Sequence, residues 1–149
     1  MHRLFIMTDF AIYTGLFFSA FLAATLVPGS SEAVLVSLLI GGRGEPWVLL
    51  AVATVGNVLG STANWACGRF LARFKDRAWF PVSPRRYDQA VAWYGRYGLW
   101  SLLLAWVPII GDPLTAAAGA LRAPLVPFLA VVTVGKLARY LVVFSLALP

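Results

Sequence analysis

Two apolar stretches of this chain are each interrupted midway by proline, glycine and an acidic residue. Residues 10–27 carry no charge, and then Pro28, Gly29 and Glu32 follow before the apolar residues resume. Residues 97–121 are interrupted in the same way, at Pro108, Gly111, Asp112 and Pro113. Proline and glycine end helices, and a serine or an acid can cap the next one. Each interruption therefore predicts a break between two helical arms.

Most of these arms are too short to cross a bilayer alone. A helix needs about 20 apolar residues to span the hydrocarbon core, whereas the arm after the first break, residues 33–42, is about half that length. We therefore predict two re-entrant helical hairpins. For residues 10–27, a full span followed by a half helix remains an alternative.

The overall composition places the chain in a membrane. Hydrophobic residues make up 60% of the 149 residues and charged residues only 12%, against about 25% charged residues in a soluble domain. The length allows one domain, residues 1–149. The net charge is +6, but the basic residues gather in the connection 69–98, which is typical of a cytoplasmic loop and not of a nucleic-acid surface. A surface for anionic lipids is the alternative interpretation of this loop.

The uncharged residues 47–68 are long enough to span. Gly56, Gly60, Asn64 and Gly68 follow at intervals of four and share a helical face, where small residues let another helix approach closely. The amides of Asn57 and Asn64 need partners in lipid, so both are candidate site residues.

The polar linker, about residues 73–96, predicts an interfacial amphipathic helix. Ser83 and Pro84 fit the N-cap and first position of a helix. Tyr87, Val91 and Tyr94 then share one face, with the charged residues largely elsewhere.

The two halves form a weak internal repeat. Pro28 and Pro108 differ by 80 positions, as do Glu32 and Asp112. Repeat 1 covers about residues 10–70 and repeat 2 about residues 97–148. Because one span separates the two hairpins, they enter from opposite sides of the membrane, which makes the repeat inverted. The fold class is therefore an all-α integral membrane protein, with each re-entrant hairpin followed by a transmembrane helix.

Glu32 and Asp112 are the leading candidates for substrate or proton binding. An intramembrane carboxylate is costly and marks a functional site by default, although helix capping explains each acid equally simply. Lys136 and Arg139 lie inside the last apolar stretch, residues 124–148, and can supply countercharge. Arg69 is a further candidate, with snorkelling to the interface as its alternative.

Other classes of site find no support in the sequence. The single cysteine, Cys67, and the single histidine, His2, are too few to build a metal or cofactor centre on these residue types. No Ser/His/Asp set or phosphate-binding glycine loop is present. We predict no cofactor, no metal and no enzyme activity.

The chain resembles the small YqaA branch of the DedA superfamily, also called the SNARE-associated or VTT-domain family. The similarity covers most of the sequence, and its runs are Leu26-Val27-Pro28-Gly29-Ser30-Ser31-Glu32, residues 56–65 with Gly68-Arg69, Trp106-Val107-Pro108-Ile109-Ile110-Gly111-Asp112-Pro113, and Gly135-Lys136 with Arg139-Tyr140.

The resemblance implies a multi-pass protein of the bacterial inner membrane with two facing hairpins. It also implies movement of phospholipids or polyprenyl phosphates, as a flippase, scramblase or proton-coupled transporter, with Glu32 as the functional acid and Lys136 or Arg139 as the basic residue. Larger members carry arginines around the second break that are absent here, where Asp112 is present instead. A zwitterionic lipid, a cationic solute and a non-transporting structural or assembly role therefore stay open. Membrane lipids, protons and a second copy of the chain are the expected partners.

Overall fold

The computed structural model describes residues 2–25, 29–80, 82–107 and 109–148, and all regular secondary structure in these ranges is helical. The all-α prediction is confirmed. The elements in chain order are α1 (His2–Thr25), α2 (Ser30–Ile40), α3 (Pro46–Leu71), η1 (Ala72–Phe74), α4 (Pro84–Tyr97), η2 (Gly98–Trp106), α5 (Gly111–Ala120) and α6 (Leu125–Ala147).

Three helical segments in the described ranges are long and apolar enough to cross a membrane. They are Thr8–Thr25 within α1, Pro46–Phe74 and Leu125–Ala147. Helix α1 begins at His2, before the uncharged residues 10–27. Charged residues near its start end the apolar stretch, but they do not end the helix.

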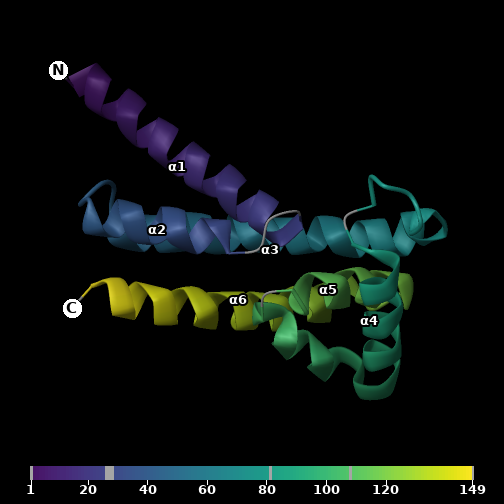
Figure 1. Cartoon of the computed structure of the whole chain (residues 1–149). Helices are drawn as coiled ribbons and strands as arrows, with labels where there is room; N and C mark the ends of the chain where they lie inside the picture. Colours follow the sequence, from purple (N-terminus) through teal and green to yellow (C-terminus); the bar gives the residue numbers. More distant parts are fainter. Residues whose placement is uncertain (1, 26–28, 81, 108, 149) are drawn as a thin grey trace.

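Figure 1 shows α3 and α6 running along the length of the molecule, with both termini at the same end. Helix α1 slants in from this end to the middle, where α2 begins and runs back. At the opposite end, η2 leads inward from α4, and α5 returns from the middle towards that end (Figure 1). Helices α3 and α6 contact each other, and α5 packs against α3.

The register of α1 against α3 fixes how far α1 reaches. The backbone N–H of Glu45, just before α3, donates to the Tyr13 hydroxyl at 2.9 Å. Near the other end of α1, the Asn64 amide donates to the Ala24 carbonyl at 2.8 Å. Asn64 lies two turns before the end of α3, which corresponds to about 10 Å of helix. Helix α1 therefore ends beside the interior of α3.

The predicted row of small residues on α3 is buried, but it faces two partners. A Cβ at Gly56 or Gly60 would collide with the α1 backbone, whereas one at Gly68 would overlap the carbonyl of Ala116 in α5. Residues four apart drift by about 40° around a helix of 3.6 residues per turn. The row thus begins under α1 and ends under α5.

Helix α4 lies across one end of the molecule (Figure 1). It begins at Pro84 with Ser83 at the N-cap, as predicted, although the cap makes no side-chain hydrogen bond. Tyr87 is buried, and Val91 and Tyr94 pack against the apolar core. The charged residues of α4 are exposed, which confirms that the helix is amphipathic, while its place at the membrane interface stays a prediction.

Candidate functional site: a buried charge cluster

Two helices begin in the middle of the molecule with an acid in the first turn. Glu32 lies in the first turn of α2 and Asp112 in the first turn of α5. Gly29 precedes α2 with φ 88°, a conformation that favours glycine. Ile109 precedes α5 with φ 75°, which is strained for a β-branched residue. Such strain persists where the surrounding structure imposes it, commonly at functional sites.

The predicted break residues near these turns have different outcomes. Pro28 and Pro108 lie outside the described residues. Gly111 is packed so tightly that a Cβ would meet the backbone of Ala105, and Pro113 is buried in the first turn of α5. Gly111 therefore permits close contact between η2 and α5, the two arms on either side of the second break.

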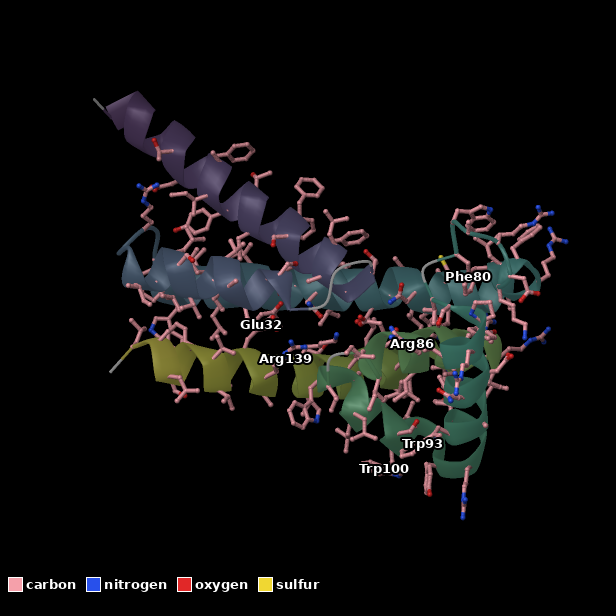
Figure 2. All side chains as sticks on the ribbon, viewed as in Figure 1. Glu32, Phe80, Arg86, Trp93, Trp100 and Arg139 are labelled. Atoms are coloured by element: carbon pink, nitrogen blue, oxygen red, sulfur yellow. The ribbon has the colours of Figure 1, made fainter. Side chains whose placement is uncertain are left out.

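Each acid pairs with a cation from the middle of α6. The Arg139 Nη2 lies 2.5 Å from Glu32 Oε1, and Lys136 Nζ lies 3.6 Å from Asp112 Oδ1. Figure 2 shows Glu32 and Arg139 facing each other between α2 and α6. Lys136 is only 2% exposed. Because residues three apart share a helical face, α6 presents both cations to the two acids together.

Further hydrogen bonds fix this cluster to the neighbouring helices. Arg139 Nη1 donates to the Trp106 carbonyl at the end of η2, at 3.0 Å. The hydroxyls of Ser31 and Tyr140 are hydrogen-bonded at 2.7 Å. The Asn57 amide donates to the Tyr140 hydroxyl at 3.0 Å and to an α1 carbonyl at 3.2 Å. The cluster therefore connects α1, α2, α3, α5 and α6, together with the end of η2.

The charged groups enclose one small cavity. Its volume is about 10 Å³, enough for roughly one water molecule. Its lining includes both acids and both α6 cations, together with Ala23, Gly29, Ser31, Asn57 and Val107. Within the described part of the chain, the Oδ1 atom of Asn57 is buried and accepts no hydrogen bond. The two carboxylates thus belong to a single site.

The remaining predicted site residues lie away from this cavity. Arg69 is exposed in the last turn of α3, with its guanidinium 5.4 Å from the Trp65 ring centroid. Asn64 is buried, and its amide holds the end of α1. The structure does not bring Arg69 to the acids because α3 carries it to the end of the molecule.

Sequence reasoning did not include Tyr140 and Ser31 among the site residues. Tyr140 is 1% exposed and lies four residues after Lys136, on the buried face of α6. Its spacing of four residues from the mid-span Lys136 is the sequence signal that could have identified it. Ser31 is fully buried and precedes Glu32, where it suggested only a helix cap.

The electrostatics of the cavity suit an anion or a proton. With both acids ionised, two negative and two positive side chains sum to zero. The N-terminal ends of α2 and α5 add positive partial charge, which favours anionic groups. No cluster of three or more metal-ligating side chains occurs in the described ranges.

Comparison with known protein families gives the family assignment. Residues 27–147, which include both breaks and the charge cluster, match the VTT domain. The chain belongs to the VTT-domain family, within the DedA superfamily. No solved structure matches it.

Relatives in this family extend the assignment. The chain is 43% identical to the inner membrane protein YqaA of Escherichia coli over 128 residues, which is 86% of this chain and 85% of the relative. The YqaA protein of Shigella flexneri gives the same figures. An uncharacterised protein of Haemophilus influenzae is 35% identical over 143 residues, or 90% and 86% of the two chains. These names and the candidate spans support the predicted inner-membrane location of this VTT-domain chain.

Proposed function

We propose that this protein moves an anionic lipid, a phospholipid or a polyprenyl phosphate, across the inner membrane together with protons held by Glu32 and Asp112. The observation that carries the proposal is the meeting of both acids with Lys136 and Arg139 around one buried cavity. Replacing a buried ion pair with apolar residues is commonly neutral or stabilising. Two such pairs at membrane depth therefore favour a functional role over a purely structural one.

Charge balance gives a mechanism. Protonation of Glu32 weakens its hold on Arg139, which is then available for a phosphate, and Asp112 and Lys136 act in the same way. One proton and one phosphodiester bring opposite unit charges to the cluster, so the occupied site stays neutral. A net charge in the low-dielectric interior is strongly disfavoured. Release of the phosphate returns the cations to the carboxylates. The only covalent change is the O–H bond that forms and breaks at the carboxylate.

The proposed membrane arrangement is an inverted pair of re-entrant hairpins. The end of α1 beside the interior of α3 supports a first hairpin that enters and leaves on one side. Two glycines also occupy related places: Gly56 faces the first arm α1, and a Cβ added at Gly135 would lie 3.5 Å from the Leu103 carbonyl oxygen of η2. Each span thus has a glycine against the first arm of its own half.

Cysteine labelling tests this arrangement. In a Cys67→Ser background, Arg43→Cys and Trp79→Cys should react with a membrane-impermeant maleimide from opposite sides, with Trp79→Cys facing the cytoplasm. The two positions lie at opposite ends of α3, which we place across the membrane. Reaction of both cysteines from the same side would rule out the inverted arrangement.

Neutral isosteres test the transport role. Glu32→Gln and Asp112→Asn should each reduce proton-driven translocation of fluorescent phosphatidylglycerol in reconstituted vesicles by about tenfold or more. This corresponds to the loss of one charge-assisted hydrogen bond, about 1.5–3 kcal/mol. Glu45→Gln, which alters an exposed acid outside the cavity, is the matched control.

The same assay separates the structural alternative. If Glu32→Gln and Asp112→Asn both fold and keep full translocation, the proposed mechanism is wrong. If they lose folding while the folded fraction keeps its specific activity, the cluster serves as an interhelical tie.

A further inference from the structure

An apolar groove lies between α4 and the second pair of arms, on the other side of the hairpin tip from the charge cluster. Its volume is about 510 Å³, within the range of sites for small ligands. One wall is the α4 stripe Arg86, Gln89 and Trp93, with Ala90 and Ala92. The other wall is apolar and consists of Leu104, Ile109, Ile110, Pro113 and Leu114.

The groove has a polar end and an apolar end. Arg86 and Gln89 are exposed on α4, across the end of the molecule, whereas Ile110 and Pro113 lie beside the start of α5 in its middle. Figure 2 shows Arg86 and Trp93 along α4, with Trp100 beyond them. A ligand in the groove would therefore have its polar part against α4 and its apolar part towards the hairpin tip.

A second hollow adjoins the first. Its volume is about 420 Å³, and it is lined by Trp93, Tyr97, Trp100, Ser101 and Leu104. Trp93 and Leu104 line both hollows and stand between them. Two adjoining apolar hollows match the two acyl chains of a diacyl phospholipid, with Arg86 and Gln89 at the polar end of the first hollow.

The positive charge at the polar end of the groove favours an anionic headgroup. Arg86 lines the groove near the start of α4, whereas the neighbouring Arg85 does not. A cation near the membrane surface attracts anionic lipids, whereas a zwitterionic headgroup gains little. Gln89 can donate a hydrogen bond to a phosphate or glycerol oxygen.

We propose that the two hollows bind one anionic diacyl phospholipid, with its headgroup at Arg86 and Gln89 and one acyl chain on each side of Trp93. This role rests on the proposed function: the site would hold the lipid before its phosphate reaches Lys136. The groove ends at Ile110 and Pro113, and Asp112 between them lines the polar cavity. The hairpin tip thus separates the bound lipid from the charge cluster.

Photolabelling tests the site without requiring transport. The full-length protein is reconstituted in phosphatidylcholine vesicles with a trace of phosphatidylglycerol that carries a diazirine on one acyl chain. We expect labelling by this probe to concentrate on the groove residues and to exceed labelling by the same probe built on phosphatidylcholine. Equal labelling by the two probes would indicate ordinary contact with surrounding lipid and would overturn the inference.

Two matched pairs of variants sharpen the result. Arg86→Gln should lower the preference for the anionic probe by about fivefold, whereas Arg85→Gln, one position outside the groove, should leave most of it. Leu104→Trp should remove groove labelling, whereas Leu103→Trp, on the neighbouring exposed residue, should not. Equal losses within either pair, or cross-links between two copies of the chain through the groove, would contradict lipid occupancy.

The two proposals fail separately. If groove labelling shows no anionic preference while Glu32→Gln still stops translocation, the lipid site is wrong and the proposed function stands. If the labelling behaves as expected while Glu32→Gln keeps full translocation, the groove remains a lipid site and the proposed function is wrong.

Discussion

Lys136→Met should lower the stability of the folded protein by roughly 3 kcal/mol, the lower end of the cost of breaking a buried pair, because it leaves the partly buried Asp112 carboxylate without its cation. Lys136 lies in the middle of α6 and is almost fully buried, so no more than the single water that fits the cavity can take the place of its ammonium group. The measurement is the loss of helical circular dichroism as dodecyl sulfate is added to detergent-solubilised protein. A loss below 1 kcal/mol would mean that the pair contributes little.

The double variant Lys136→Met with Asp112→Asn is the control for this result. It removes both charges, so most of the lost stability should return. Translocation should nevertheless stay low, because one of the two cations that we propose to bind the phosphate is gone. Recovery of stability without recovery of transport would separate the structural and functional contributions of the pair. Recovery of both would show that Lys136 is not needed for transport.

Gly68→Ala should be among the most damaging single-methyl changes in the described part of the chain, at about 3 kcal/mol or more, the upper end of overpacking costs. The new Cβ would overlap the Ala116 carbonyl, and backbone atoms cannot move aside without separating α3 from α5. Gly119→Ala should behave alike, since its Cβ would overlap the Trp65 carbonyl. The expected observation is a large drop in the dodecyl sulfate concentration at half-unfolding.

Gly95→Ala provides the matched comparison. A Cβ at Gly95 meets nothing within 4 Å. Because alanine is favoured over glycine inside a helix by roughly 0.5–1 kcal/mol, this variant should be neutral or slightly more stable. If Gly68→Ala and Gly95→Ala gave the same result, close backbone packing between α3 and α5 would be excluded.

Much of the helical framework could be predicted because it depends on local signals. The uncharged run before α2, the Ser83-Pro84 start of α4 and the glycine row of α3 are each readable from a few neighbouring residues. The 3₁₀ conformation of Gly98–Trp106 could not be foreseen, since such runs seldom exceed three or four residues. Packing against α6 and α5, not local preference, holds this arm.

The candidate site was predictable in its members but not in its pairing. Mid-span charges are rare, so Glu32, Asp112, Lys136 and Arg139 stood out in the sequence. Which acid meets which cation depends on how α2 and α5 dock on α6, and no spacing encodes that. Arg69 was included for its charge alone, and its position at the end of α3 places it outside the cluster.

Both cations of the cluster sit on one helix, a single turn apart, while their acids come from two separate half helices. A rigid α6 cannot tilt or rotate by much without straining both ion pairs together. The two ion pairs would then be coupled through α6. A movement of α2 on one side of the cavity would also disturb the ion pair that holds α5. In an alternating-access cycle, binding at the α2 side of the cavity would therefore change how easily α5 moves, and binding at the α5 side would do the same for α2.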